Sequence, residues 1–593
     1  MKNTVMKKWD LERLFPDGLE HALLSKNEQI GTLQEQIKNS KTPENFRDFL
    51  FIVEGVQELY SDVFAIDEYA ICLSSQDVHD ESGHYVMDQS QRLKAKMETL
   101  LLTFNHYIAA IDESSWHQWI QAEELAEIRT SLMERRKQVK DRLAPELEQV
   151  IHTLSMNGFE GWEDLYEQEF ARLRVPVEEN GERKELSFDM AFMKAMLSKD
   201  RSVRASIASS IIEVCKQNQE QFALIFNHFS GFRNDLYELR GWTNPLKEMY
   251  EQNRISESSV NSMMKALHEH KDLLYRFLIR KAQVDSIPKP DWYDLYAPSF
   301  TTKTTLTYEE ATEIVIKQFS RYSQKLGDFA KQAFHDGWVD AEPHENKRHG
   351  AFCASFPNAK ESRVLLSFQG TYQDVVTMAH ELGHAYHNTL LHEQPGFAQH
   401  AGTGLAETAS TFAENLVLDA AIDLAETEED ALSLLEMKII NGLKYTTFIP
   451  AKFEFEKDFY EKRKQGKLSS SEIIDLMEAK EREWFGDHLE HVNAYNWLSI
   501  PHFYDTEKAF YNLPYTIGYL FSNGIYSQYK ESPKSFPEKY DGLLSHSGDL
   551  PMDELCADFL GQDLNKQTFW NESFRPLKDA IEEYITRTES YVS

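Results

Sequence analysis

Cysteine and long apolar runs are both scarce in this sequence, and each scarcity excludes a class of protein. The 593 residues contain four cysteines, Cys72, Cys215, Cys353 and Cys556, which lie far apart and form no CxxC pair. This spacing argues against a disulfide framework and favours a reducing compartment. No run reaches about 18 apolar residues, and the basic N-terminus lacks an apolar stretch, so we expect neither a membrane span nor a signal peptide. The cytoplasm is the expected location.

Basic residues are outnumbered by acidic ones. Lys and Arg total 63 against 97 Asp and Glu, and the formal net charge is −34. This excess disfavours a nucleic-acid partner, because an acidic surface repels phosphates. Two interpretations of the acidity stay open. It either surrounds a large soluble protein with solvated charge, or it lines a cleft that attracts cationic peptides.

Glycine and proline are few in roughly the first 170 residues, where apolar residues recur every three or four positions and predict long amphipathic helices. Two short β-rich runs then flank Asn180-Gly181, a dipeptide typical of a tight hairpin turn. We therefore expect an N-terminal helical region, residues 1–190, that ends in a β-hairpin. A second region, residues 191–593, carries the chemistry. The chain shows neither low-complexity sequence nor an internal repeat.

One stretch, HELGHAYH at residues 380–387, contains the pattern HExxH. In a helix, residues i and i+4 lie on one face, so His380 and His384 can share a divalent metal ion. Glu381 then projects beside the metal, where it can take a proton from a bound water. The flanking residues are apolar and indicate a buried helix, in which three polar side chains need partners. The longer motif HExxHxxGxxH is excluded, because Leu390 stands where that motif needs a third histidine.

A third metal ligand has to come from another element, and a carboxylate on a following helix is the remaining option. The segment GTGLAETASTFAENL begins with Gly402, Thr403 and Gly404, which we expect to form a loop, and continues as a helix. Glu407 falls in the first turns of that helix and is the expected third ligand. Glu414, two turns later on the same face, is better placed to accept a hydrogen bond from a ligand histidine. Two histidines and one glutamate leave the fourth position of zinc open for water, which is the catalytic arrangement.

The main β-strand signal stands immediately before this motif. Residues 350–356 and 362–368 are β-rich runs joined by Pro357 and Asn358, and they predict a small sheet beside the HExxH helix. An exposed edge of this sheet could pair with an extended peptide substrate. The alternative is a two-stranded floor that only braces the helix. Both interpretations stay open.

The C-terminal segment IPHFYDTEKAFYNLPYTIGY carries a histidine and four tyrosines: His502, Tyr504, Tyr511, Tyr515 and Tyr519. A tyrosine stripe at helical spacing is usual in a packed core. A hydrolytic metal site also needs a hydrogen-bond donor for the oxyanion that forms, and a protonated phenol can provide it. The residues alone leave both interpretations open.

Taken together, HELGHAYH, LAETASTFAENL, the upstream WYDLYAP and the downstream HFY and FYNLPYTIGY resemble the oligoendopeptidase F branch of the thimet-oligopeptidase-like zinc peptidases. The resemblance runs from residue 140 to 575 and is densest at 350–420. It implies a mainly α fold, an elongated helical body in two halves around a deep channel, with a small β-sheet beside the zinc helix. It also implies one zinc ion per chain at the channel floor and cleavage of short unstructured peptides.

Matched position by position, the resemblance assigns a role to each candidate residue. His380, His384 and Glu407 correspond to the metal ligands, and Glu381 corresponds to the general base. The remaining candidates are expected to contact the substrate, two as catalytic residues (His502 and Tyr511) and five as binding residues (Tyr504, Tyr515, Tyr519, Gly402 and Gly404). The loop after His502 is longer than in thimet oligopeptidase, so the identity of the tyrosine that faces the substrate is left open.

The sequence therefore predicts a zinc endopeptidase that cleaves internal bonds of short oligopeptides by means of a water activated by Glu381. An exopeptidase of the carboxypeptidase type is one alternative, and it needs a cationic clamp for a free terminus. A non-catalytic peptide-binding relative is the other alternative, and the intact HExxH argues against it. Oligopeptides are the expected partners, with no nucleic acid and no membrane, and the oligomeric state is not predicted.

Overall fold

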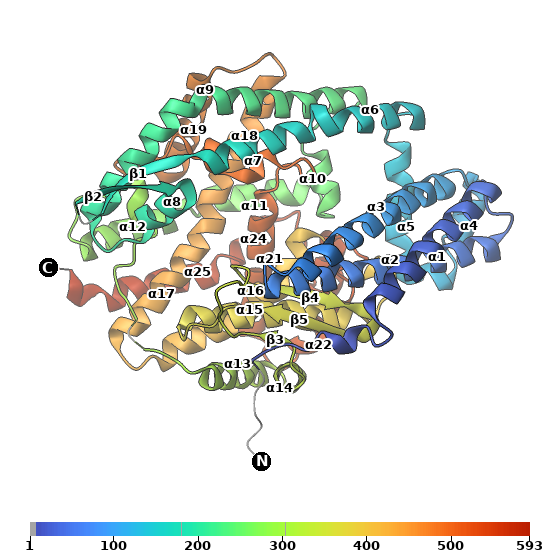
Figure 1. Cartoon of the computed structure of the whole chain (residues 1–593). Coiled ribbons are helices and arrows are strands. Elements are labelled where there is room, and N and C mark those ends of the chain that lie inside the picture. Colours follow the sequence, from blue (N-terminus) through green and yellow to red (C-terminus); the bar gives the residue numbers. More distant parts are fainter. Residues whose placement is uncertain (1–6, 180, 303, 593) are drawn as a thin grey trace. The chain divides into compact units, whose positions relative to one another are not determined.

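The computed structural model describes residues 7–179, 181–302 and 304–592. Helices make up most of this part of the chain, and two small sheets complete it (Figure 1). Within the described residues, no helix is both long and apolar enough to cross a membrane. The expected mainly helical fold is confirmed.

The chain forms two compact units, and each unit combines three segments of the sequence. Unit 1 comprises residues 1–142, 304–421 and 528–562, and unit 2 comprises residues 143–303, 422–527 and 563–593. Each unit is described by itself. The residues of each unit lie close together, but this does not show that either unit folds alone. The expected regions 1–190 and 191–593 therefore stay a prediction. The expected channel also stays a prediction.

Unit 1 starts with a helical bundle and continues with the sheet and helices that surround the HExxH motif. Its main elements are α1 (Leu19–Ser40), α2 (Phe46–Gln76), α3 (Glu81–Ala109), α4 (Glu113–Trp119), α5 (Arg129–Lys140), α13 (Tyr308–Tyr322), α14 (Gln324–His335), β3 (Val339–Asp340), β4 (Phe352–Phe356), β5 (Glu361–Leu365), α15 (Tyr372–Leu391), α22 (Phe536–Ser545) and α23 (Met552–Leu555). Two of the five borders between the units fall inside further helices, α16 (Thr403–Leu424) and α21 (Leu513–Glu531).

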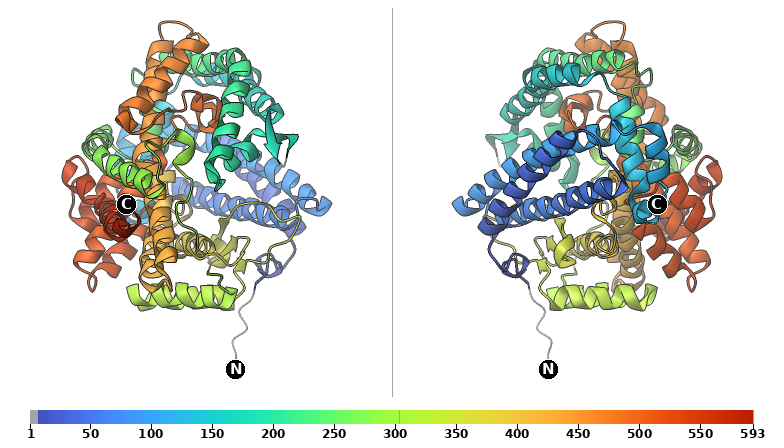
Figure 2. Two further views of the ribbon diagram at one scale, coloured as in Figure 1. Left: turned by 90° about the vertical axis from the view of Figure 1, so that its left-hand side faces the viewer. Right: turned by 90° about the vertical axis from the view of Figure 1, so that its right-hand side faces the viewer.

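The bundle of unit 1 follows from the apolar spacing of its helices. Helix α2 packs against both α1 and α3, the neighbouring blue helices in Figure 2. Asn45 starts α2, because its side chain accepts a hydrogen bond from the Asp48 N–H. Phe49, Val53 and Val56, which recur every three or four residues, are buried in the core of the bundle. The expected long helices of this region are confirmed.

The sheet of unit 1 lies directly beside α15. Its strand order is β3-β5-β4, with β4 antiparallel and β3 parallel to β5. Both β4 and β5 pack against α15, so the expected small sheet beside the HExxH helix is confirmed. The third strand, β3, was not expected, because two residues are too few to produce an alternating pattern. Strand β4 has one edge that no other strand of the described residues covers, and α2 also packs against β4.

Unit 2 is also built largely from helices. Its main elements are α6 (Pro145–Gly158), α7 (Glu160–Arg172), β1 (Arg174–Glu179), β2 (Glu182–Ser187), α8 (Phe188–Leu197), α9 (Arg201–Leu239), α10 (Lys247–Gln252), α11 (Glu257–Glu269), α12 (Lys271–Val284), α17 (Glu428–Leu443), α18 (Ile449–Arg463), α19 (Ser470–Phe485), α20 (Asn496–Ser499), α24 (Gln567–Glu572) and α25 (Arg575–Arg587). Strands β1 and β2 pair antiparallel, as the hairpin prediction requires. Asn180, one of the two expected turn residues, lies outside the described residues.

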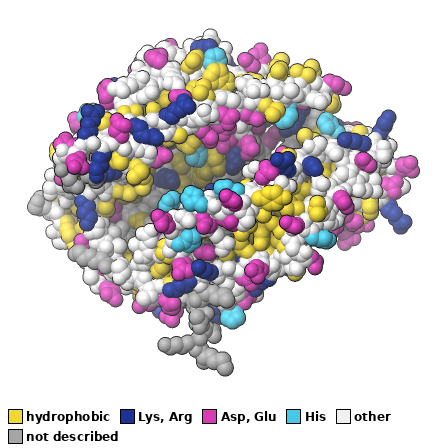
Figure 3. Space-filling model, viewed as in Figure 1, with side chains coloured by type: hydrophobic (Ala, Val, Ile, Leu, Met, Phe, Trp, Pro, Cys, Tyr) yellow, Lys and Arg dark blue, Asp and Glu magenta, His cyan; other side chains and the backbone are white. Residues whose placement is uncertain are grey.

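Acidic side chains are spread among basic ones on the face of the molecule that Figure 3 shows. Acidic side chains also form partly exposed ion pairs, such as Lys325–Asp541 at 2.7 Å and Arg587–Glu428 at 2.8 Å. This distribution supports a solvated acidic surface. An acidic cleft that attracts cationic peptides stays a prediction.

Candidate metal centre

Helix α15 presents the HExxH motif, and its sequence explains why the helix forms there. The hydroxyl of Thr371 accepts a hydrogen bond from the Asp374 N–H, and the Asp374 carboxylate accepts one from the Thr371 N–H. This reciprocal pair satisfies N–H groups that the start of a helix leaves without partners. Most apolar residues of the helix are buried. His380 and His384, one turn apart, therefore project from a firmly anchored helix toward the same side.

Helix α16 comes very close to α15 at Gly383. A Cβ atom on Gly383 would lie 2.6 Å from the carbonyl oxygen of Ala409 and 2.8 Å from the Cα atom of Ser410. Only a residue without a side chain permits such a short distance between two helix backbones. Because Gly383 lies between the two histidines, this contact brings the beginning of α16 next to both of them.

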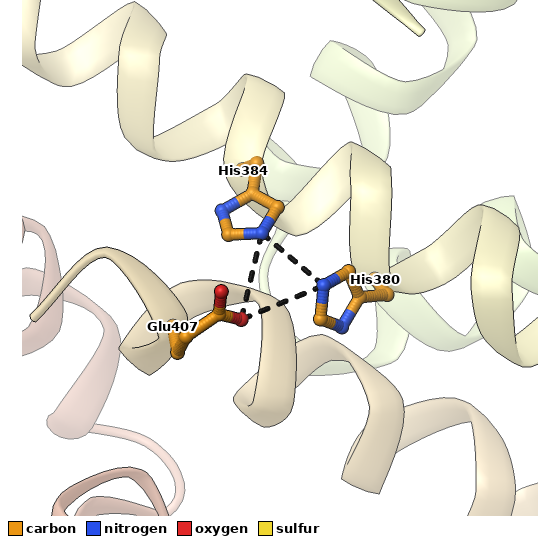
Figure 4. A group of neighbouring side chains, drawn as sticks. All are labelled: His380, His384 and Glu407. Carbon is orange, nitrogen blue, oxygen red and sulfur yellow. Dashed lines mark hydrogen bonds and ion pairs between the residues drawn. The ribbon is translucent and has the colours of Figure 1, made fainter. Parts of the chain in front are cut away.

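Three side chains from α15 and α16 converge on one point (Figure 4). The Nε2 atoms of His380 and His384 are 3.2 Å apart, and one carboxylate oxygen of Glu407 lies 3.5 Å from the first and 3.6 Å from the second. Ligand atoms placed at about 2.1 Å around a tetrahedral ion are about 3.4 Å from one another. The three atoms therefore have the spacing that a single metal ion requires.

Glu414 contacts the other ring nitrogen of His380. Its Oε1 atom lies 2.5 Å from His380 Nδ1. A proton on Nδ1 is thus held by Glu414, and the lone pair of Nε2 is left for a metal ion. Burial lowers the pKa of His380, but this hydrogen bond and the neighbouring carboxylates outweigh it and raise the pKa to about 9. The geometry agrees with the expected place of Glu414 behind a ligand histidine.

Glu381 lies beside the same group and is buried, with 6 % of its surface exposed. Burial raises the pKa of Glu381 to about 7; His380 opposes the rise, and two carboxylates, Glu407 and Glu414, add to it. Burial and the adjacent His380 lower the pKa of His384 to about 4. A divalent cation would favour the ionised carboxylates and the neutral imidazoles. The donor set thus fits a metal ion chemically as well as geometrically.

Ser410 supports Glu407, and the sequence analysis assigned it no role. Its hydroxyl, which is fully buried, donates a hydrogen bond to the Glu407 carboxylate at 2.9 Å. The same carboxylate oxygen faces the two histidines. The spacing of three residues along α16 is the signal that could have identified Ser410.

The third histidine of HELGHAYH lies outside the metal group. His387 is buried, and its Nε2 atom is 2.6 Å from the hydroxyl oxygen of Ser547. Burial, with His384 adding to the effect, lowers the pKa of His387 to about 3. The neutral ring is therefore used for packing α15 against the segment around Ser547.

The glycine-rich segment before α16 is shorter than expected. We expected Gly402, Thr403 and Gly404 to form a loop, but α16 begins at Thr403 and includes Gly404 in its first turn. The Gly402 carbonyl accepts hydrogen bonds from the N–H groups of Leu405 and Ala406, each at 2.9 Å, and these bonds start the helix. The prediction that Gly404 lies in a loop is wrong. Contact of Gly402 and Gly404 with substrate stays a prediction.

Unit 2 contains the expected cluster of a histidine and tyrosines. The ring of His502 is centred 4.9 Å from that of Tyr511 and 5.7 Å from that of Tyr515. The Tyr511 hydroxyl oxygen accepts a hydrogen bond from the Tyr515 hydroxyl at 3.0 Å and from Lys508 Nζ at 3.1 Å. Burial lowers the pKa of His502, and Lys452 lowers it further. The imidazole is therefore neutral near pH 7.

A cavity of about 180 Å³ adjoins this cluster within unit 2. Its lining consists of Glu163, Tyr166, Glu167, Pro501, His502, Tyr504, Asp505 and Tyr511. His502 and Tyr511 therefore border open volume, which a tightly packed core would not leave. This observation favours a functional interpretation of the two residues over core packing.

Tyr504, which also lines this cavity, and Tyr519 make further contacts. Tyr504 is buried, its hydroxyl donates to the carbonyl of Trp497 at 3.2 Å, and its ring stacks on Tyr166 with 3.7 Å between ring centres. Tyr519 stacks on Tyr445 at 4.9 Å. A substrate-binding role for Tyr504 and Tyr519 stays a prediction.

A second group of potential metal ligands, His268, Glu454 and Glu483, lies elsewhere in unit 2. Lys480 Nζ is 3.3 Å from the Glu483 carboxylate and 3.9 Å from that of Glu454. The indole of Trp484 also donates to Glu454, at 3.0 Å. Lys480 and Trp484 thus already provide partners for the two carboxylates, so we do not assign a metal ion to this group.

Comparison with known proteins finds relatives along nearly the whole chain. The profile of Peptidase family M3 matches residues 194–575, and the profile of Oligopeptidase F matches residues 108–174. An oligoendopeptidase F homolog from Lactococcus lactis subsp. lactis is 21 % identical over 98 % of both chains. Oligopeptidase PepF from Bacillus subtilis is 22 % identical over 92 % of this chain and 82 % of its own.

Solved structures share the fold. A protein from Chlamydophila abortus superposes with a TM-score of 0.85 at 19 % identity, over 98 % of both chains. Oligoendopeptidase-F from Enterococcus faecium gives a TM-score of 0.71 at 18 % identity, over 96 % of this chain and 99 % of its own. Because the identities are low, these likenesses show the fold and not the activity.

Proposed function

Because this chain belongs to peptidase family M3, we propose that it is a zinc-dependent endopeptidase that hydrolyses internal bonds of short, unstructured peptides. The observation that carries the proposal is the convergence of His380, His384 and Glu407 at ligand spacing. Three protein ligands leave a fourth position for water, as in catalytic zinc sites. Relatives that are named oligoendopeptidase F support the substrate class.

Zinc is the proposed ion because of the chemistry of the donors. Two imidazole nitrogens and one carboxylate oxygen suit zinc, whereas calcium and magnesium prefer oxygen ligands throughout. Glu414 orients His380 through its Nδ1 atom, and Ser410 orients Glu407. Such outer contacts fix the direction of the ligand atoms. One zinc ion per chain is proposed.

Glu381 is the proposed general base of the reaction. A zinc ion at the site would supply a Lewis acid and lower the pKa of a coordinated water to about 7. Glu381, adjacent to His380 in the chain and buried beside the metal group, would take the proton of the attacking water and pass it to the leaving amine. Glutamate performs both transfers only if its carboxylate stays close to the metal group, and the burial of Glu381 in α15 supports this.

Tyr511 is the proposed donor to the oxyanion, with His502 beside it. The Tyr511 oxygen accepts hydrogen bonds from Tyr515 and Lys508, so its own proton stays available for a substrate oxygen. Tyr515 uses its proton on Tyr511 and is therefore the supporting residue. Loss of one such donor typically costs about 3–4 kcal/mol of transition-state stabilisation.

The cytoplasm is the proposed location, since all four cysteines are free. Oligopeptides are the proposed partners. The exopeptidase alternative requires binding of a free terminus, and the endopeptidase proposal does not, so peptides blocked at both ends separate the two.

The proposed function is tested with a library of peptides acetylated at the N-terminus and amidated at the C-terminus. Mass spectrometry of the products, with and without a chelator, should show internal cleavage that is lost on chelation and restored by Zn²⁺. Cleavage that persists after exhaustive chelation would contradict the metal assignment. Cleavage only of peptides with a free terminus would favour the exopeptidase.

A further inference from the structure

The uncovered edge of β4 exposes only alternate residues. In an antiparallel pair, the N–H and C=O groups of one residue point to the partner strand and those of the next residue point away. The Ser355 N–H points away from β5, because it donates a hydrogen bond to the Glu68 carboxylate of α2 at 3.2 Å. Cys353, two residues earlier, therefore also directs its backbone groups to the uncovered edge.

Strand β4 runs alongside α15 in the direction away from the metal group. Its Cys353 thiol lies 3.6 Å from the Asn388 side chain, and the Ser355 hydroxyl lies 2.8 Å from His392 Nε2. Asn388 is one helical turn after His384, and His392 is a turn further. Ser355 therefore lies farther from the proposed metal ligands than Cys353 does. The difference is about 6 Å, close to the rise of one helical turn.

We propose that the Glu68 carboxylate closes the distal end of the β4 edge and sets how many substrate residues can pair with that strand on one side of the cleaved bond. The proposal rests on the proposed peptidase function. A peptide that adds to the edge meets the backbone groups of Cys353, which point toward it, whereas the N–H of Ser355 already donates to Glu68. Glu68 is therefore a specificity-determining residue and not a catalytic one.

The length of the permitted stretch follows from helix and strand geometry. From His384 to His392 the helix rises about 12 Å, at 1.5 Å per residue. An extended peptide covers that distance with about four residues, at 3.3 Å each. Substrates should accordingly gain affinity from about four residues on this side of the cleaved bond, and nothing from strand pairing beyond them.

The surroundings of Glu68 support a role other than stabilisation of the fold. Burial raises its pKa to about 7; the Ser355 hydrogen bond opposes the rise, Asp67 adds to it, and Lys94 opposes it. Asp67 itself is satisfied, because Ser90 donates to it at 2.8 Å and Lys94 at 3.3 Å. A carboxyl group held where ionisation is unfavourable adds little net electrostatic stabilisation to the fold.

The test compares Glu68→Ala with Glu68→Gln on blocked peptides that share one cleavage position and are lengthened residue by residue. In the wild type, KM should stop falling beyond about four residues on one side. In Glu68→Ala the Ser355 N–H is freed, so two further residues should lower KM about fivefold to tenfold, the effect of one added hydrogen-bonded pair. Glu68→Gln should match the wild type, because its amide oxygen still accepts from Ser355.

The control is Asp67→Ala, which removes a neighbouring carboxylate of α2 that accepts from Ser90 and Lys94, whereas Ser355 donates to Glu68. It should keep the wild-type length profile. An identical profile in Glu68→Ala and the wild type would overturn the inference, while cleavage of the blocked peptides would leave the proposed function standing. If the wild type cut none of the peptides, the proposed peptidase function would be refuted. Binding affinities of the same peptide series would then still test whether Glu68 closes the β4 edge.

A second measurement needs no variant, in case Glu68→Ala folds poorly. Single N-methyl groups are placed along a wild-type substrate. N-methylation of the residue opposite Cys353 should raise KM about tenfold, because it removes a backbone hydrogen bond and introduces a clash. N-methylation two residues further, opposite Ser355, should leave KM unchanged. Equal sensitivity at both positions contradicts a closed edge.

Discussion

Glu381 and Glu407 have different proposed roles in the candidate metal centre, so their replacement should have different effects. Glu381→Gln removes the proton acceptor and leaves the group of His380, His384 and Glu407 intact, so metal content should persist while kcat falls roughly 10²–10⁴-fold. Glu407→Ala removes a ligand and should lower metal affinity itself. Metal analysis combined with turnover separates the two.

The control for both variants is Glu393→Gln. Glu393 follows α15 and forms an exposed ion pair with Lys360 at 2.7 Å, so its neutralisation should change neither property. If Glu407→Ala bound as much metal as Glu381→Gln, Glu407 would not be a ligand, and Glu414 would be the next candidate.

The three tyrosines of α21 and the preceding segment should give graded effects. Tyr511→Phe should lower kcat and kcat/KM together by about 10²–10³, because its hydroxyl acts in the transition state. Tyr515→Phe should have a smaller effect, since it removes only a hydrogen bond to Tyr511. Tyr519, which stacks on Tyr445, is expected only to bind substrate, so Tyr519→Phe should raise KM and leave kcat unchanged. Normal kinetics in all three, with a lower melting temperature, would favour core packing.

Local spacing predicted that His380, His384 and Glu407 lie together, as the structure shows, whereas contacts between distant residues could not be predicted. His380, His384, Glu407 and Glu414 follow from helical spacing within one short stretch of sequence. Ser547 lies 160 residues from His387, and no periodic pattern connects the two. The contact between Glu68 and Ser355 spans 287 residues and likewise depends on tertiary packing alone.

At the scale of elements, the close approach of α15 and α16 should be intolerant of a single methyl group. In Gly383→Ala, the added Cβ would meet the Ala409 carbonyl and the Ser410 backbone, which cannot move as a flexible side chain can. Overpacking of this kind costs about 1–3 kcal/mol. The variant should melt at a lower temperature and bind metal more weakly, because α16 carries Glu407.

Gly31→Ala provides the matched control for that substitution. Gly31 lies inside α1 and has no atom within 4 Å of the position a Cβ would take. Alanine there should raise stability by about 0.5–1 kcal/mol through its better helix propensity. Thermal unfolding and metal titration of both variants measure the effects. Equal metal affinity in Gly383→Ala and the wild type would show that the spacing of the helices does not position Glu407.

Element boundaries were predicted less well than element types. The first β-rich run forms a strand only from Phe352, and the second from Glu361, one residue earlier than expected. Strand β3 pairs with β5 over two residues, too few for a pattern. Helix α16 begins at Thr403, because the Gly402 carbonyl is free to accept the first hydrogen bonds of the helix.

At the scale of the whole molecule, the proposed activity should be limited by substrate length and folding. Peptides of up to roughly 20 residues should be cleaved, because ordering each further residue in an extended form costs about 1–2 kcal/mol of backbone entropy. A native folded protein should resist, and the same protein should be cut after it has been unfolded and divided into short peptides. Efficient cleavage of the native protein, measured by mass spectrometry, would contradict the proposed substrate class.

The positions of the proposed ligands predict which parts of the chain a bound metal ion should stabilise. His380, His384 and Glu407 all belong to unit 1, and unit 2 has its own buried aromatic residues, such as Trp484 and Trp497. Chelation should therefore abolish hydrolysis and leave the far-UV circular dichroism nearly unchanged, because cores of this size do not depend on one ion. Bound metal should raise the melting temperature by mass action. Hydrogen exchange with and without Zn²⁺ should show added protection in α15 and the first turns of α16, and none in α9 of unit 2. Protection that spreads equally through α9 would mean that the metal organises the whole chain and not only the helices that hold it.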